Sequence, residues 1–448
     1  MSPRAGGLCV ALAWLVAAAP QAAGQGLQTR IDTLMASGLR EGMVAGGSVA
    51  VFKDGRLVAQ GGYGFADLEN RVPATPATWY RLGPITEVFT ASAAMRLVES
   101  GSLRLEEDVA DSVPELARAG RHATLAQLLS HTSGLPDAIG AKALDYLQRD
   151  VSPGMWLQLY ASEPPDFQPG AGWGYSRLGY YAAQQVVEHA ARKPLELLDR
   201  EHPGDSLPAW DSRLYLVDHR AHGYEIYKNR LVIPRYVAAS GFGATGLGWT
   251  APQLARWVDA LRSGRLISEG SLARMLTPTR LADGTTVGAG LGVRLGSLEG
   301  HSLWGQCGSG QGFSSAVVVY PSDQLVIVVL CNTDSPLLPA WQLEERIARV
   351  VLDLPPGTTL DLPTPPSDLS TFAGRWISSG EALQIYEDQG HLVVARPGSS
   401  NLPLLYQGDG RYFIYGPEHE LRFAAVGGRS AWILHYEAGL FMSVDRAR

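Results

Sequence analysis

Residues 128–136 read Leu-Leu-Ser-His-Thr-Ser-Gly-Leu-Pro, and this run says most about the fold of the chain. On its N-terminal side, a helical pattern extends from about Pro84 to Ser100, with apolar residues on one face and Gly101 as its stop. On its C-terminal side, helical and loop segments continue to about Thr277. The run therefore lies in the middle of a predominantly helical region.

Strand patterns flank this helical region on both sides. Gly47–Phe52 alternates small and apolar residues, and Leu57–Tyr63 is its return strand after a turn at Lys53–Arg56. The order predicts an α/β (α+β) unit, in which one antiparallel sheet from both ends of the chain is flanked by helices beside an all-helical subdomain. The later elements are expected at Gly290–Leu295, His301–Gln306, Phe313–Tyr320 and Gln324–Leu330 (strands) and at Trp341–Leu352 (an amphipathic helix).

A smaller domain is expected after a proline-rich linker, which we assign to residues 354–367. Residues 368–448 contain short alternating strands with turns about every 8–12 residues, which predicts a small antiparallel barrel or sandwich. We expect the barrel. Its strands are expected at Gly374–Ile377, Leu383–Tyr386, His391–Ala395, Arg411–Tyr415, Leu421–Ala425 and Ala431–Tyr436.

The N-terminus has the composition of a secretory signal peptide. Arg4 supplies the positive charge, Leu8–Ala19 is a short apolar segment, and small residues up to Gly24 permit cleavage. The apolar segment is shorter than a good membrane span, and a retained anchor is the alternative. We expect residues 1–24 to be removed, which leaves residues 25–353 as the main unit of a secreted, periplasmic protein with no stable membrane span.

The composition and the minor motifs exclude several classes of function. A net charge of −7 over 448 residues gives no electrostatic footprint for nucleic acid. Gly241–Gly246 matches a dinucleotide-binding pattern, but no βαβ unit surrounds it, so we interpret it as a turn. His219 and His222 follow Asp218 without a further ligand cluster, so we interpret them as solvated. We expect neither a cofactor nor a metal.

Two cysteines, Cys307 and Cys331, remain after removal of the signal peptide. They fall on two expected strands with a third strand, Phe313–Tyr320, between them. Because that strand would hold the two Cα atoms too far apart for a disulfide, we expect two free, buried thiols.

Four stretches together resemble the serine β-lactamase and D,D-peptidase superfamily, and most closely its branch of class C β-lactamases and related esterases. The tail resembles the lipocalin-like domain that is often appended to such proteins. The resemblance implies a β-lactamase/transpeptidase-like fold and acyl-transfer chemistry. The matching stretches are Val51–Gly55, Gly62–Asp67, residues 128–136 and Gly312–Ser315, in the order and spacing of the superfamily.

The resemblance also implies three catalytic motifs: Ser-x-x-Lys at a helix start, Tyr-x-Asn in the helical subdomain, and Lys-Thr-Gly or His-x-Gly on a strand. Each motif can be located, and each is altered. Pro84 and Glu87 replace the serine and the lysine, Arg177 replaces the asparagine after Tyr175, and Gln306 takes the lysine or histidine position before Cys307, Gly308 and Ser309.

These replacements remove the chemistry that the superfamily needs. Pro84 has no hydroxyl to act as a nucleophile, and it has no backbone N–H for an oxyanion hole. Glu87 reverses the charge of the activating lysine. Gln306 removes a cation that would bind a substrate carboxylate. The resemblance implies that positions 87 and 177 face each other across the cleft floor. Because Glu87 and Arg177 carry opposite charges, we predict an ion pair between them, within about 4 Å; the alternative is that both side chains turn outward to water.

Two residues offer alternative chemistry. Tyr175 could act as an acid or a base, or be a wall residue with a hydrogen-bonded hydroxyl. Cys307 should lie near the cleft and could be a nucleophile, or be an inert packed thiol. We interpret His131 as a hydrogen-bonded structural residue.

The sequence therefore favours a non-catalytic protein that binds a small molecule, a peptide or an unidentified protein partner. One alternative is a working esterase, peptidase or β-lactamase that uses Tyr175 or Cys307. The other is an interaction subunit of an active relative.

Overall fold

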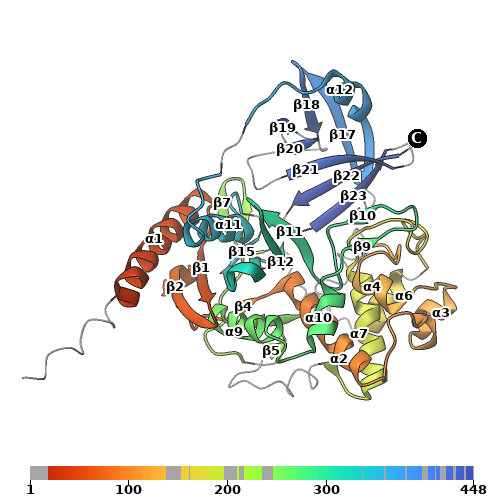
Figure 1. Cartoon of the computed structure of the whole chain (residues 1–448), viewed down its shortest axis with the longest axis horizontal. Coiled ribbons are helices and arrows are strands. Elements are labelled where there is room, and N and C mark those ends of the chain that lie inside the picture. The colour runs from red at the N-terminus through yellow and green to blue at the C-terminus, as the bar shows by residue number, and fades with distance from the viewer. Residues whose placement is uncertain are drawn as a thin grey trace, which may run out of the picture.

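The computed structural model of the chain has a sheet-and-helix unit and a separate β-domain (Figure 1). Both parts follow the order expected from the sequence. The residues that the structure describes are 19–137, 153–160, 162–195, 209–210, 216–234, 246–334, 336–357, 360–378, 381–395, 402–408, 410–413, 420–426, 430–437 and 440–446.

The main sheet has seven antiparallel strands in the order β11-β12-β13-β14-β1-β2-β3. The prediction that both ends of the chain build one sheet is confirmed, because β1 pairs with β14. At the β1–β2 turn, Asp54 and Gly55 both have positive φ, which is the geometry of a tight hairpin. The strands are β1 (Gly46–Lys53), β2 (Arg56–Asp67), β3 (Val72–Pro73), β11 (Arg294–Leu298), β12 (His301–Gly310), β13 (Phe313–Tyr320) and β14 (Leu325–Cys331).

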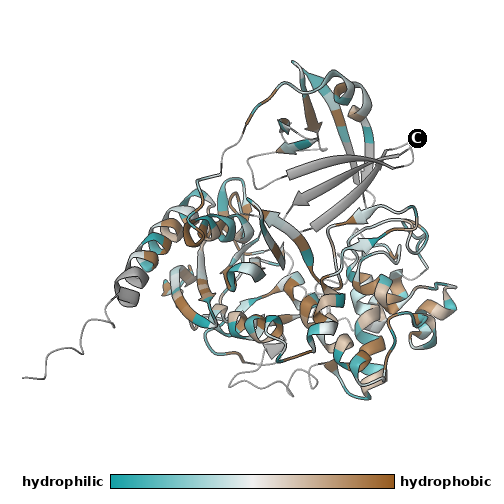
Figure 2. Ribbon diagram, viewed as in Figure 1, coloured by the Kyte–Doolittle hydropathy of each residue, from teal (hydrophilic) through white to brown (hydrophobic). Residues whose placement is uncertain are grey.

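Helices cover both faces of this sheet, and therefore every residue of β13 and β14 is buried. One face packs against α1 (Ala19–Glu41) and α11 (Ala340–Val351), the second of which was expected as an amphipathic helix. Figure 2 shows hydrophobic and hydrophilic residues side by side on both helices, as helices with only one buried face require.

The other face packs against the helical subdomain and α9. Thr124 and Gln127 form a capping box at the start of α4, and Ser176 caps α7. The helices are η1 (Gly83–Ile85), α2 (Thr86–Glu99), η2 (Val109–Asp111), α3 (Pro114–Arg118), α4 (Leu125–Leu129), α6 (Pro153–Tyr160), α7 (Arg177–Ala191), α9 (Ala251–Arg262), α10 (Glu269–Met275) and η3 (Pro321–Asp323). Short strands complete the unit: β4 (Tyr80–Arg81), β5 (Ala209–Trp210), β6 (Tyr224–Tyr227), β7 (Arg230–Val232), β8 (Leu247–Trp249), β9 (Thr279–Arg280), β10 (Thr286–Val287) and β15 (Thr333–Asp334).

The C-terminal domain is a closed barrel of eight strands, which follows the short helix α12 (Pro366–Phe372). The linker contacts the barrel, because the Gln407 side chain hydrogen-bonds the backbone of Leu360 through both its oxygen and its nitrogen. Two strands, β19 and β23, were not expected from the sequence. The barrel strands are β16 (Gly374–Ser378), β17 (Glu381–Asp388), β18 (His391–Ala395), β19 (Leu402–Gly408), β20 (Arg411–Phe413), β21 (Glu420–Val426), β22 (Ser430–Glu437) and β23 (Leu440–Arg446).

Helix α1 was also not expected. Ile31, Met35 and Leu39 face the sheet and are buried, while Asp32 accepts a hydrogen bond from the Tyr63 hydroxyl on β2. Residues 1–18 of the predicted signal peptide lie outside the described part of the chain. Within that described part, no helix combines the length and the apolar character needed to cross a membrane.

Candidate functional site

Pro84 lies in η1, at the point where the chain enters helix α2. Its ring packs directly against Gly308 on β12: a β-carbon added to Gly308 would collide with the ring atoms of Pro84. Gly83 supplies the positive φ, 55°, that turns the chain into this position. The proline that replaces the expected nucleophile therefore lies against the inner strand of the cleft.

Glu87 lies in the first turn of α2, is completely buried and is held by hydrogen bonds. Its Oε2 atom accepts a hydrogen bond of 3.1 Å from Gln306 Nε2 and lies 3.2 Å from His131 Nε2. The backbone N–H of Ser176 donates to the other ring nitrogen of His131, Nδ1, over 3.2 Å. Because Nδ1 accepts this hydrogen bond, the ring proton lies on Nε2, where it faces Glu87.

Glu87 Oε1 and Tyr175 Oη lie beside this network, and neither atom makes a hydrogen bond of good geometry within the described structure. Burial raises the pKa of Tyr175 well above its usual value of 10, and the nearby charge of Glu87 and a hydrogen-bonding interaction with that carboxylate raise it further. Tyr175 therefore keeps its proton at neutral pH. Its hydroxyl can donate a hydrogen bond but cannot serve as a base.

The predicted ion pair between Glu87 and Arg177 is wrong. Arg177 instead pairs with Asp137: Nη2 donates to Oδ2 over 2.7 Å and Nε donates to Oδ1 over 3.0 Å. The backbone N–H of Arg177 donates to the same Oδ1 atom. Asp137 follows the 128–136 run directly and lies beside the start of α7. Its carboxylate, and not that of Glu87, therefore pairs with Arg177.

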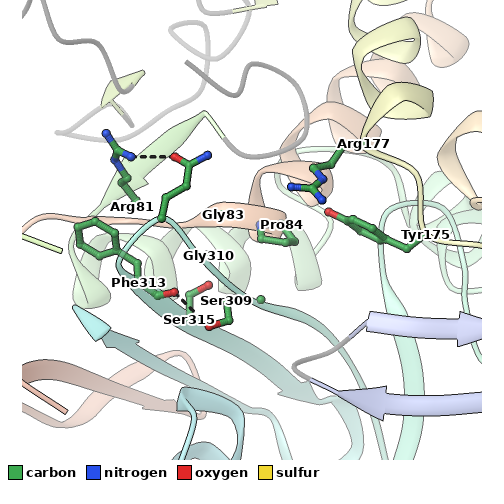
Figure 3. A pocket seen from close by; sticks show the side chains of 11 residues that line it. Arg81, Gly83, Pro84, Tyr175, Arg177, Ser309, Gly310, Phe313 and Ser315 are labelled. Atoms are coloured by element: carbon green, nitrogen blue, oxygen red, sulfur yellow. Dashed lines mark hydrogen bonds between the residues drawn. The ribbon is translucent and has the colours of Figure 1, made fainter. Parts of the chain in front are cut away.

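A small hollow of about 80 Å³ opens above Pro84. Figure 3 shows Arg81 at one end, Tyr175 and Arg177 at the other, and Pro84 between them. Arg81 Nη1 donates to Gln311 Oε1 over 2.8 Å, and its guanidinium lies over the ring of Phe313. The remaining lining residues are Gly83, Gly308, Ser309, Gly310 and Ser315.

Cys307 does not lie in this hollow. Strand side chains alternate between faces, and Gln306 and Gly308 point toward Glu87 and Pro84. Cys307 therefore packs on the opposite face, in the core beneath α1 and α11. Burial raises the pKa of its thiol. The expectation that Cys307 lies near the cleft is wrong, whereas the expectation of two free, buried thiols at Cys307 and Cys331 is confirmed.

The candidate serines and histidines have other partners. Ser309 Oγ donates to Asp334 Oδ1 over 3.0 Å. His222 lies 3.6 Å from Asp67 and groups with Asp67 and Glu69 rather than with His219. Asp67 is already occupied by Asn70, whose side chain donates to it over 2.6 Å. Of Gly241–Gly246, residues 241–245 lie outside the described residues.

The structure therefore brings together seven of the eight site positions predicted from the sequence, all except Cys307. The predicted site positions did not include Arg81, Gln311 and Asp137, whose side chains form hydrogen bonds at the site. A signal existed only for Arg81, which precedes the altered Ser-x-x-Lys position by three residues. Asp137 and Gln311 lie in loops whose path the sequence pattern did not indicate.

A helix start that faces the inner strand of a sheet, with a helical subdomain closing the other side of the cleft, defines the scaffold of the serine β-lactamases and penicillin-binding proteins. The chain belongs to this family: the model described as Beta-lactamase matches residues 27–352.

Relatives share both domains. Penicillin-binding protein 4* of Bacillus subtilis (strain 168) is 24% identical over 447 residues, which cover 92% of this chain and 96% of that protein. The structure of the octameric penicillin-binding protein homologue from Pyrococcus abyssi is 21% identical with a TM-score of 0.67, over 93% of this chain and 99% of that one. The crystal structure of SurE is 22% identical with a TM-score of 0.67, over 96% and 100%.

Proposed function

We propose that this protein is a non-catalytic member of the Beta-lactamase family, which binds a ligand or a partner in the cleft above Pro84. The observation that carries the proposal is the contact between Pro84 and Gly308. It places a ring without hydroxyl or N–H where the family mechanism, inferred by resemblance, needs a nucleophile and half of an oxyanion hole.

The groups around Pro84 support the same proposal. Glu87 gives its Oε2 atom to His131 and Gln306, so that oxygen is engaged in a buried network. Tyr175 keeps its proton because burial and Glu87 raise its pKa. Tyr175 therefore cannot accept a proton from an attacking hydroxyl or water in the way that the family's tyrosine does, and Glu87 does not supply the positive charge of the family's lysine.

Export to a periplasm is also part of the proposal. It rests on the charged, apolar and small-residue segments within residues 1–24. The intact mass of the protein recovered from the periplasm should correspond to a chain that begins at Gln25. A mass that still includes Met1 would contradict export by cleavage.

Covalent labelling tests the lack of a nucleophile. Purified protein should gain no mass after incubation with benzylpenicillin or with a fluorophosphonate probe. Penicillin-binding protein 4* of Bacillus subtilis, treated in parallel, is the reference protein. A stoichiometric mass increase of this chain would refute the proposal, and the labelled peptide would identify the true nucleophile.

A further inference from the structure

Asp67, Glu69 and His222 form a cluster of metal-ligating side chains outside the hollow above Pro84. Each offers one ligand atom, a carboxylate oxygen or an imidazole nitrogen, and these three atoms all lie within 4.8 Å of one another. Asp67 is the last residue of β2, whereas His222 lies just before β6, so the fold brings together two distant parts of the chain. None of the three is among the described residues that line the hollow.

The backbone of His222 holds its ring beside Asp67. The His222 N–H donates to the carbonyl of Ala66 over 2.8 Å, and its own carbonyl accepts a hydrogen bond of 2.9 Å from Asn332 Nδ2. Nδ1 of His222 then lies 3.6 Å from Oδ2 of Asp67, which is too long for a direct hydrogen bond. The distance suits a shared ion, because two ligands that each lie about 2.1 Å from one zinc ion are at most about 4.2 Å apart.

The carboxylate of Asp67 is oriented by its own donors. Oδ1 accepts the backbone N–H groups of Glu69 and Asn70, and Oδ2 accepts a hydrogen bond of 2.6 Å from the Asn70 side chain. A carboxylate oxygen has two lone pairs, so Oδ2 can accept this bond and still bind an ion. Carboxylates that ligate metals are commonly held by hydrogen bonds of this kind.

Glu69 brings a second carboxylate to the solvent side of the cluster. The preceding residue, Leu68, is fixed by a hydrogen bond of 2.7 Å from its N–H to the Tyr224 hydroxyl. Two carboxylates this close repel each other, and within the described part of the chain no lysine or arginine pairs with Asp67 or Glu69. A bound divalent cation would remove this repulsion.

We propose that Asp67, Glu69 and His222 bind a zinc ion. One imidazole and two carboxylates form a mixed nitrogen and oxygen set, which suits zinc better than magnesium, whose preferred ligands are oxygens. Glu69 and His222 are exposed, so water has access to the remaining coordination position. The proposal does not depend on the proposed function of the cleft, and either can fail without the other.

Equilibrium binding of zinc to the untagged, metal-free protein tests the proposal. Isothermal titration calorimetry at neutral pH should show one zinc ion per chain, with a dissociation constant of about 10 μM or tighter. Magnesium should bind at least about tenfold more weakly, because it gains little from an imidazole ligand.

Three variants locate the ion. His222→Asn and Glu69→Gln should each weaken zinc binding at least about tenfold, because each removes one ligand of the set. His219→Asn is the matched control: it removes an exposed imidazole from the same segment, and asparagine tolerates the positive φ, 57°, of that position. It should leave zinc binding unchanged. Thermal unfolding without zinc confirms that each variant is folded.

A lack of saturable zinc binding would overturn the proposal, as would equally tight binding in His222→Asn or in Glu69→Gln. A loss in His219→Asn as large as that in His222→Asn would assign the ion to another place. Magnesium that binds as tightly as zinc would contradict the role of the imidazole.

Discussion

His131 and Glu87 meet in the buried floor of the cleft, where His131 Nε2 lies 3.2 Å from Glu87 Oε2. The side chains are 7% and 0% exposed. The Ser176 backbone N–H fixes the proton of His131 on the nitrogen that faces Glu87. The family resemblance implies a lysine at the start of α2. In this chain the same position holds the Glu87 carboxyl group, with hydrogen-bond donors around it.

Removal of His131 should therefore destabilise the fold more than neutralisation of Glu87. His131→Ala removes one of the two donors that the described structure shows at Glu87 Oε2, and it opens a cavity. We expect a loss of roughly 3 kcal/mol or more in the free energy of unfolding. Glu87→Gln keeps an acceptor oxygen and removes the buried charge, so it should cost about 1 kcal/mol. Urea unfolding measures both values.

The double variant His131→Ala with Glu87→Gln is the control for coupling. It should cost less than the sum of the single changes, because no stranded charge remains. Strict additivity of the three measurements would show that the two side chains do not interact.

The ion pair between Arg177 and Asp137 gives a second prediction. Arg177→Gln should cost roughly 1–3 kcal/mol, because it strands Asp137, whose side chain is 7% exposed. The Arg177 side chain is 27% exposed, so solvent screens part of the effect. A double-mutant cycle with Asp137→Asn should show coupling, and a cycle with Glu87→Gln should show little. The reverse order of the two couplings would contradict the pairing.

Periodicity and turn chemistry predicted most of the fold. Strands β13 and β14 of the main sheet contain continuous stretches of valine and other apolar residues. Such a stretch is typical of a strand that is buried on both faces, so these strands could be located from the sequence. Helix α1 was missed because its apolar residues are sparse and adjoin the signal-like segment. Strand β19 was missed because Pro403 interrupts its pattern.

The site could be predicted in its positions but not in its pairings. Local motifs fix where Pro84, Glu87 and Gln306 lie along the chain. They do not determine which of two nearby acids pairs with a given arginine. The pairing of Arg177 with Asp137, and not with Glu87, therefore could not be predicted. Strand alternation shows on which face of the sheet the Cys307 side chain lies, but only when the direction of its neighbour Gln306 is known. The structure shows that Gln306 points toward Glu87, so Cys307 points to the opposite face.

Stability should fall as the pH rises from about 5 to 8, in part because of Glu344 on α11. Burial raises the pKa of Glu344 from 4.5 to about 8, and Tyr320 donates a hydrogen bond to it over 3.3 Å. Below the unfolded value both states hold the proton. Above it, only the unfolded chain releases the proton, so stability is lost until the pH passes the folded value. The effect is of the order of several kcal/mol.

Glu344→Gln should flatten this dependence. The difference in unfolding free energy between pH 5 and pH 8, measured by urea titration, should shrink in the variant and stay the same in Glu106→Gln, whose side chain is 76% exposed. An equally steep fall in Glu344→Gln would assign the pH dependence to other groups.

The double variant Pro84→Ser with Glu87→Lys should not restore hydrolysis. The serine would supply a hydroxyl and an N–H. The lysine, however, would replace Glu87, at a place where His131 and Gln306 present hydrogen-bond donors. Because Ser176 holds His131 Nδ1 as an acceptor, His131 Nε2 keeps its proton and would point an N–H at the new ammonium. A cation in that buried place would face the N–H groups of His131 and Gln306 that now serve Glu87, which disfavours its charged form and displaces its side chain. Turnover of a chromogenic ester should stay more than about tenfold below that of an active family member with an intact Ser-x-x-Lys motif, and Pro84→Ser alone serves as the matched control. Turnover by the double variant within that factor, a gap of about 1.4 kcal/mol in activation free energy, would show that the floor of this cleft accepts a lysine despite its donors.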